Sequence, residues 1–262
     1  MKPFGEWDTD LRCKCYLLVE GNIIFEDDHI IVVYKPAGIA TQTARLGQQD
    51  MVSELKNYLA KKPEHKSNDV PYLGVVHRLD QPVSGILVFV RTKQAAAELS
   101  RQVTNGQMQK YYYAVIYGAP AKELDRLEDY LYKDGKTNQS QIVKADFPNA
   151  KKAVLDYRLI KTLMAYGESL SESHEISLME IELITGRHHQ IRVQMSHAGM
   201  PLLGDSKYGN CQSKDLSQQI GCRGVALCAY KLEFIHPVTR EKVTFEKKPD
   251  SEIFLPFFTK GI

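Results

Sequence analysis

The segment Val75-Val-His-Arg-Leu-Asp-Gln-Pro-Val-Ser-Gly85 carries the most unusual combination of residues in this 262-residue chain. Two valines lead into the charged tetrapeptide His77-Arg-Leu-Asp80, and a proline-bearing turn leads into the apolar run Gly85–Arg91, which predicts strand, loop and strand. Loops held by a rigid sheet are where catalytic groups concentrate, whereas an aspartate before Gln-Pro is also a common turn residue. The segment alone leaves both interpretations of Asp80 open and favours the turn.

Strand and helix patterns alternate on both sides of this segment. Ile23–Phe25 and Ile30–Tyr34 are predicted as short strands because they are rich in β-branched residues. Asp50 is predicted to cap a helix with apolar residues at helical spacing. Thr92 is predicted to cap a second helix, which ends at Asn105-Gly106.

Strands outnumber helices in the rest of the chain. Further strands are predicted at Lys110–Tyr117, Ala153–Ile160, Ile176–Ile184 and Val225–Phe234. A third helix is predicted to end at Gly199, and Gly135-Lys-Thr137 predicts a polar hairpin connection, because a phosphate loop would need glycine in place of Tyr130. We therefore expect an α+β domain with an antiparallel or mixed sheet over residues 23–262, after a short N-terminal extension of residues 1–22.

The composition is that of a globular protein with a substantial core. The chain is 43% hydrophobic and 25% charged, which excludes disordered, collagen-like and coiled-coil proteins. Its apolar runs are far shorter than the ~20 residues of a membrane span, and its N-terminus lacks the features of a signal or transit peptide. The odd number of cysteines, with no Cys-x-x-Cys pair, favours reduced thiols at Cys13, Cys15, Cys211, Cys222 and Cys228. We expect a cytoplasmic protein with no membrane contact.

Charge is distributed unevenly, although the net charge is only +2. Residues 1–30 hold three basic and seven acidic side chains, a net of −4, whereas residues 185–240 hold seven basic and three acidic ones, a net of +4. Basic side chains grouped in one part of a chain favour contact with phosphates. The C-terminal half is therefore predicted to face a polyanion.

Two further segments concentrate polar and aromatic side chains. Thr185-Gly-Arg-His-His-Gln-Ile-Arg-Val193 places Arg187 near a helix N-terminus, where it is either a ligand for a carboxylate or phosphate or an ordinary surface cation. The adjacent His188 and His189 would point apart on a helix, so we expect no metal site. Lys110-Tyr-Tyr-Tyr-Ala114 would place Lys110 and Tyr112 on one face of a strand, although an aromatic strand is normally part of the core.

Taken together and in this order, these segments resemble the RluA family of RNA pseudouridine synthases, in its short form without an S4 RNA-binding domain. The matching motifs run from about Ile24 to Pro237: Glu26-Asp-Asp-His-Ile-Ile-Val-Val-Tyr-Lys-Pro-Ala-Gly38, His77–Asp80 with Ser84-Gly85, Lys110-Tyr-Tyr112, Gly186–Arg192, His197–Asp205 with Tyr208-Gly209, and Leu232–Pro237. The resemblance implies the pseudouridine synthase fold, a large mixed and mostly antiparallel sheet with flanking helices and a central catalytic cleft. It also reverses the interpretation of Asp80 as a plain turn residue.

The resemblance implies that a uridine within RNA is isomerised without any cofactor. Asp80 matches the essential carboxylate, which either attacks C1′ of the ribose or removes the C2′ proton. Arg187 is expected to pair with Asp80 and keep it ionised. Tyr112 is expected to stack on the uracil and to assist removal of the C5 proton. Arg78 is expected to enter the space that the flipped nucleotide leaves.

The remaining matches are candidates for substrate binding or support of the cleft: His77, Lys110, Ile191, His189, Gln190, Arg192 and Lys35. Lys110 is further hypothesised to help Tyr112 act as a base, and Ile191 to pack on the flipped base. The chain departs from the usual family pattern at Val83, His188 and Gln194, which puts the target in doubt and leaves the reaction unchanged. The implied partner is ribosomal or transfer RNA, bound by a monomer that needs no protein partner.

Two other functions remain open. A non-catalytic RNA-binding protein or chaperone with this fold would tolerate loss of Asp80. A nucleoside or glycoside hydrolase also cleaves a bond at C1′, but such enzymes usually need a second carboxylate. Asp205 is the only acidic residue in the third and fourth motifs, and its Gly-Asp context predicts a turn.

Overall fold

A computed structural model describes residues 20–43, 47–63, 69–165 and 173–259 of the chain. Its elements are, in order, β1 (Ile23–Glu26), β2 (Ile30–Lys35), α2 (Met51–Ala60), β3 (Gly74–Val75), β4 (Ser84–Val90), α3 (Lys93–Thr104), β5 (Gln109–Tyr117), β6 (Leu124–Asp134), β7 (Gln139–Val143), β8 (Lys151–Ala165), β9 (His174–Leu183), α4 (Gln190–His197), α5 (Cys211–Gln219), β10 (Leu227–Ile235), β11 (Lys242–Glu246) and α6 (Leu255–Phe258). Within these residues, no helix is both long and apolar enough to cross a membrane.

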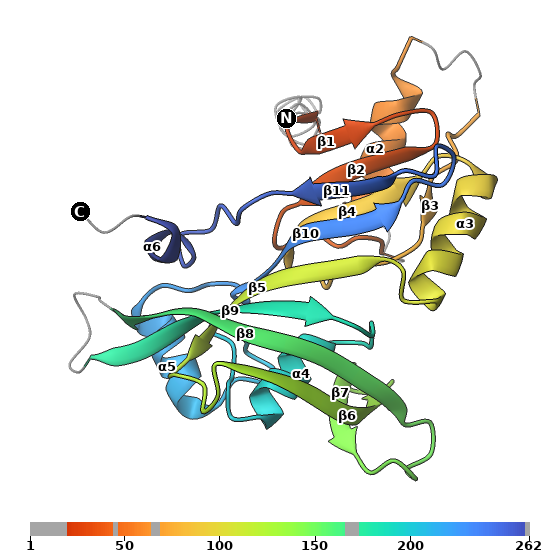
Figure 1. Ribbon diagram of the computed structural model, residues 1–262. Helices are drawn as coiled ribbons and strands as arrows, with labels where there is room; N and C mark the ends of the chain where they lie inside the picture. The colour runs from red at the N-terminus through yellow and green to blue at the C-terminus, as the bar shows by residue number, and fades with distance from the viewer. Residues whose placement is uncertain (1–19, 44–46, 64–68, 166–172, 260–262) are drawn as a thin grey trace, which may run out of the picture.

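The strands form one twisted sheet (Figure 1). Among the described residues its order is β1-β2-β4-β10-β5-β9-β8-β6-β7, with β3 paired to β4 and β11 paired to β10. Every pairing is antiparallel except that of β10 with β4. The predicted mixed, mostly antiparallel sheet with flanking helices is therefore confirmed.

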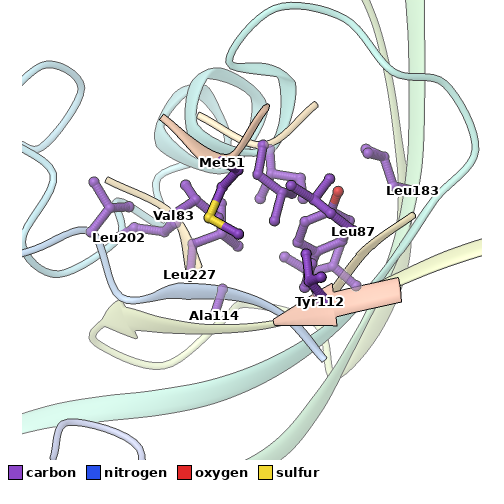
Figure 2. Packing of buried hydrophobic residues seen from close by; sticks show 14 of the residues in the cluster. Met51, Val83, Leu87, Tyr112, Ala114, Leu183, Leu202 and Leu227 are labelled. Atoms are coloured by element: carbon purple, nitrogen blue, oxygen red, sulfur yellow. The ribbon is translucent and has the colours of Figure 1, made fainter. Parts of the chain in front are cut away.

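Apolar side chains pack on both faces of the sheet. β2 and β4 are buried along their whole lengths, which explains their nearly continuous apolar sequences. One core cluster includes Met51, Leu87 and Tyr112, which Figure 2 shows close together. A second cluster includes the alternate residues of the same strands, such as Val32 and Val88. Tyr112 is thus a core residue, as expected of an aromatic strand, and it also borders the cleft described below.

Gly85 allows the loop that carries Asp80 to meet the centre of the sheet. Its φ of 134° lies in a region that other residues rarely adopt, and a Cβ atom there would clash with the backbone of Ala229 in β10. β4 and β10 meet here in parallel register, with Gly85 opposite Ala229. The glycine of the Ser-Gly pair is therefore required by a close approach of two strands.

The predicted helix boundaries agree with the structure. Asp50 accepts a hydrogen bond from the Ser53 backbone N–H at 2.7 Å, and Thr92 accepts one from that of Ala95 at 3.2 Å. Gly106 and Gly199 have positive φ angles of 69° and 78°, as helix-ending glycines do.

Some elements were not predicted. The polar connection around Gly135 does join two strands, but the sequence patterns of β6, β7, β11 and α5 were not recognised. The three described cysteines, Cys211, Cys222 and Cys228, are free thiols as predicted, and Cys13 and Cys15 lie outside the described residues. The proposed boundary between residues 22 and 23 stays a prediction.

Candidate active site

A cleft of about 1180 Å³ lies where the loop between β3 and β4, the start of β5 and the segment that leads into α4 converge. It brings together nearly all the predicted site residues: His77, Arg78, Asp80, Lys110, Tyr112, Arg187, His189, Gln190, Ile191 and Arg192. Lys35 is the predicted residue that does not line it. Three segments that are distant in sequence thus converge as the motif pattern predicts.

Asp80 is held by a cation from α4. Its side chain is 28% exposed, and its Oδ2 lies 3.3 Å from Nη1 of Arg192. Arg192 is buried, and its Nε and Nη2 donate to Asp205 Oδ2 and Oδ1, each at 2.7 Å. The arginine therefore bridges two carboxylates and fixes one oxygen of Asp80.

The predicted pair between Arg187 and Asp80 is wrong. Arg187 is exposed, and its Nε donates to the backbone carbonyl oxygen of Lys152 at 2.9 Å. The physical reason is its position before the helix, because α4 begins at Gln190 and it is Arg192, within the first turn, that faces Asp80. Arg187 still lines the cleft, to which it adds a positive charge.

Asp205 was missed as a site residue because its Gly-Asp context predicted a turn. It does form that turn, since its Oδ1 accepts the backbone N–H groups of Lys207 and Tyr208 at 3.0 and 3.1 Å. Burial acts to raise its pKa, but the hydrogen bonds and charge of Arg192 outweigh burial and hold the pKa below its ordinary value. An acidic residue inside an otherwise apolar motif was the available signal.

His189 joins Asp80 to a hydrogen-bond chain. Its Nε2 lies 3.5 Å from Asp80 Oδ2, and its Nδ1 lies 2.7 Å from the hydroxyl of Tyr208. Burial is the largest of the effects that lower its pKa to about 4, so the ring is neutral near pH 7. His189 therefore lies between the Tyr208 hydroxyl, to which Nδ1 is hydrogen-bonded, and the Asp80 carboxylate, which Nε2 faces.

The expectation that the two adjacent histidines point apart is also wrong. His189 precedes α4 with a left-handed φ of 54°, and this turn stacks its ring on that of His188 at 3.7 Å. In the described parts of the chain, no three His, Cys, Asp or Glu residues are grouped so as to hold a metal ion.

Tyr112 faces the cleft as a neutral phenol. Burial, followed by the negative charge of Asp80, raises its pKa far above the ordinary value. The net shift is opposite to the one that the Lys110 hypothesis requires. Lys110 itself lies near Gly186 at the cleft wall, and burial lowers its pKa.

Lys35 does not line the cleft, so of the two roles expected for it the structure favours support of the cleft and contradicts substrate binding. Its side chain is fully buried, and its Nζ donates to the carbonyl oxygens of Pro36, Ile39 and Gln81 at 2.9, 2.7 and 3.1 Å. Backbone carbonyls buried in a loop require such partners. Because Gln81 follows Asp80 in the chain, Lys35 anchors the loop that carries the carboxylate.

Two other predicted residues act mainly as supports. His77 accepts the backbone N–H of Val88 at its Nε2, 3.2 Å away, and burial is the main cause that lowers its pKa to about 3. The side-chain amide of Gln190 donates to the Val154 carbonyl oxygen at 3.0 Å and accepts from the Arg187 backbone N–H at 2.9 Å. Arg78 is exposed at the cleft, as a residue that moves on RNA binding would be.

Comparison with known proteins identifies the family to which the chain belongs. A family model described as RNA pseudouridylate synthase matches residues 29–197, more than half of the chain and most of the cleft. The chain belongs to the RNA pseudouridylate synthase family. The predicted family, fold and enzyme class are thereby confirmed: this is an isomerase acting on RNA.

Curated relatives and solved structures agree with this assignment. The chain is 34% identical over 239 residues to ribosomal large subunit pseudouridine synthase D of Zymomonas mobilis, covering 90% of this chain and 71% of that protein. It is 31% identical to tRNA pseudouridine synthase C of Yersinia pestis, covering 87% of this chain and 86% of that protein. The structure of human RNA pseudouridylate synthase domain containing 4 superposes with a TM-score of 0.70 at 22% identity, covering 94% of this chain and 96% of that one, which supports the synthase fold.

Proposed function

We propose that this pseudouridine synthase isomerises a uridine of ribosomal or transfer RNA, with Asp80 as the carboxylate that reacts at the ribose. One observation carries the assignment of Asp80. Arg192 engages its Oδ2, and none of the described residues hydrogen-bonds its Oδ1, so a fixed carboxylate presents one oxygen to the cleft. The choice of RNA rests on relatives whose names specify ribosomal and transfer RNA.

The chemistry conserves every atom of the nucleoside. The N1–C1′ bond breaks, the uracil rotates, and C5 bonds to C1′, after which C5 loses its proton and N1 gains one. No electrons enter or leave overall, so the proposal needs no cofactor. Asp80 either attacks C1′ or takes the C2′ proton, and both roles consume its negative charge.

Tyr112 takes part in the proposed reaction as a neutral phenol. Before reaction, burial and the charge of Asp80 keep Tyr112 protonated, so its ring offers a surface on which the uracil stacks. Both routes restore the Asp80 carboxylate when C5 bonds to C1′, because the ester is displaced in one and the C2′ proton is returned in the other. Asp80 is therefore charged again when the C5 proton leaves, and Tyr112 assists that step as a protonated phenol whose oxygen accepts a hydrogen bond.

Access to the base requires the uridine to leave its stack. Arg78 is exposed at the cleft, and its planar guanidinium is suited to fill the vacated space and offset the few kcal/mol of unstacking. Lys110 and Arg187 supply positive charge to the same cleft for the strand's phosphates. We place this activity in the cytoplasm, carried out by a monomer without a protein partner.

The proposal is tested with ribosomal and transfer RNA transcripts that carry tritium at uridine C5. Wild-type protein should release tritium without free uracil, and Asp80→Asn should release at least about 10³-fold less. A nucleoside hydrolase would instead liberate uracil. Equal inactivity of both proteins on all transcripts, with RNA still bound, would favour the non-catalytic RNA-binding alternative and overturn the proposal.

A further inference from the structure

A second cavity opens beside the catalytic cleft. It measures about 280 Å³ and lies between the β6–β7 hairpin, the start of β8 and the segment that precedes α4. Lys133, Gly186, Arg187 and His188 line both cavities, so the two are adjoining parts of one depression. A ligand group in the second cavity would therefore lie beside the group that faces Asp80.

The walls of this second cavity are cationic. Lys133, Lys151 and Arg187 contribute three positive side chains, and no acidic residue lines it. None of the three forms an ion pair with a carboxylate in the parts of the chain that the structure describes, whereas neighbouring Lys152 pairs with Glu128. Unpaired cations around a concave surface favour a bound anion.

The hairpin wall is fixed to the catalytic segment by side-chain contacts. The Ser140 hydroxyl lies 2.9 Å from Nδ1 of His188, and its backbone N–H donates to the Tyr208 hydroxyl at 2.9 Å. Lys207 Nζ donates to the carbonyl oxygen of Asn138 at 3.1 Å. The hairpin wall is therefore held in place by contacts within the protein.

We propose that this second cavity is the binding subsite for the nucleotide next to the isomerised uridine, with its phosphate held by Lys133, Lys151 and Arg187. The inference rests on the proposed function, because it takes the catalytic cleft to hold a uridine of an RNA strand. A strand that places one nucleoside in the cleft brings a phosphodiester to the adjoining cavity. The volume lies just below the ~300–1,000 Å³ of sites that enclose a whole drug-sized ligand, which suits a single nucleotide.

His188 has a defined place in this subsite. It is one of the positions where the chain departs from the pattern of the family, and its ring stands at the border of the two cavities. Burial, with the positive charge of Lys133 adding to it, lowers its pKa to about 4, so the ring is uncharged near pH 7. Ser140 and the stacked ring of His189 fix its orientation. A fixed, neutral ring is suited to contact a base, and Asn149 adds an amide for the base edge.

Binding of a short single strand tests the subsite without turnover. The probe is fluorescein-labelled hexauridylate, followed by anisotropy between 50 and 200 mM salt, with wild-type protein and Lys133→Gln/Lys151→Gln. The double variant should bind at least about fivefold more weakly at 50 mM salt. Its slope of log Kd against log salt should be smaller by about 0.7 to 1.4, the equivalent of one or two phosphate contacts on a single strand.

Lys136→Gln is the matched control, because Lys136 is exposed in the turn of the same hairpin and lines neither cavity. It should leave both affinity and slope within about twofold of the wild type, because an exposed charge that lines neither cavity is screened by salt. An equal loss in Lys136→Gln, an unchanged double variant, or no binding by the wild type at 50 mM salt would each overturn the subsite.

Turnover separates this inference from the proposed function. On an RNA that releases tritium, the double variant should raise KM at least about fivefold and leave kcat within twofold, because its lysines lie outside the reacting centre. If the wild type releases no tritium but the variants change hexauridylate binding as expected, only the proposed function is contradicted. Normal tritium release with identical KM values for double variant and wild type would contradict the subsite alone.

Discussion

Arg192 binds Asp205 through two parallel hydrogen bonds of 2.7 Å and turns its remaining nitrogen toward Asp80, 3.3 Å away. Asp80, which we propose as the reacting carboxylate, is thus positioned by a second carboxylate that lies outside the cleft lining. The side chains of Arg192 and Asp205 are both almost fully buried, so water cannot take the place of either one as the partner of the other. Bidentate pairing fixes the plane of the guanidinium, and with it the direction of the bond to Asp80.

Replacing Asp205 by Asn should therefore reduce both stability and turnover. Removing one partner of a buried ion pair leaves a buried charge uncompensated, which costs about 3–5 kcal/mol. Misplacement of Arg192 should lower kcat by about 10²-fold, since small errors in catalytic geometry have effects of that size. Thermal unfolding and single-turnover rates measure the two effects.

A surface pair provides the control for that variant. Asp156 accepts two hydrogen bonds from Arg126 at 2.6 and 2.7 Å, but the Arg126 side chain is 58% exposed. Asp156→Asn should cost no more than about 1 kcal/mol and leave kcat unchanged. Similar losses of stability and kcat in Asp156→Asn and Asp205→Asn would show that neither burial nor contact with Arg192 determines the effect of the substitution.

Replacement of Arg192, within α4, and of Arg187, just before it, should affect different kinetic constants. Arg192→Gln should lower kcat by at least about 10²-fold, because it removes the cation that holds Asp80 and leaves the buried carboxylate of Asp205 without its partner. Arg187→Gln should raise KM and leave kcat within about threefold, because its side chain is exposed and bonded to a backbone carbonyl. A large loss of kcat in Arg187→Gln and a small one in Arg192→Gln would instead support the pairing of Arg187 with Asp80 that the sequence suggested.

The motifs in the sequence were sufficient to predict the fold and the place of Asp80 in the cleft, but not the side chain that pairs with Asp80. Motif spacing places Arg187 and Arg192 equally near a helix start, and only the left-handed turn at His189 determines which one faces the carboxylate. Asp205 was missed because a turn residue and a buried ion-pair partner have the same local sequence. Side-chain direction depends on tertiary packing, which a single sequence does not express.

Strand prediction failed for a similar reason at the edge of the sheet. β6 has charged residues in pairs between its apolar ones, and Leu131 is its one buried residue, so its sequence lacks the apolar density of β2 or β4. Its hairpin is ordered by contacts to residues far along the chain, including Ser140 with Tyr208. These contacts also form the second cavity.

His77 should contribute to loss of stability in acid. Its pKa falls from 6.5 to about 3 on folding, so between these pH values the unfolded chain takes up a proton that the folded protein does not. This contribution to stability is therefore present above about pH 6.5 and is lost as pH falls toward 3. His77→Gln, which keeps an acceptor for Val88, should show a smaller fall in Tm between pH 7 and 5 than the wild type.

The exposed His197 supplies the comparison for this pH experiment. His197→Gln should retain the wild-type dependence of Tm on pH. If His77→Gln and the wild type lose the same number of degrees between pH 7 and 5, then protonation of His77 makes no contribution.

Lys35 should behave as a structural residue. Lys35→Gln leaves carbonyl oxygens of the loop after β2 and of Gln81 without donors, which should cost about 1–3 kcal/mol of stability. RNA affinity should keep its wild-type dependence on salt, because the side chain is fully buried and meets no phosphate. A reduced salt dependence would instead support the alternative role of Lys35 in RNA binding.

The central claim is that Asp80, oriented by Arg192, is the reacting group, and single-turnover formation of pseudouridine at one mapped uridine tests it most directly. Wild-type protein and Asp80→Asn are compared at saturating enzyme, with RNA affinity measured on the same preparations. We expect Asp80→Asn to bind RNA within about threefold of the wild type and to form product at least about 10³-fold more slowly. Product formation by Asp80→Asn within tenfold of the wild-type rate would contradict the account.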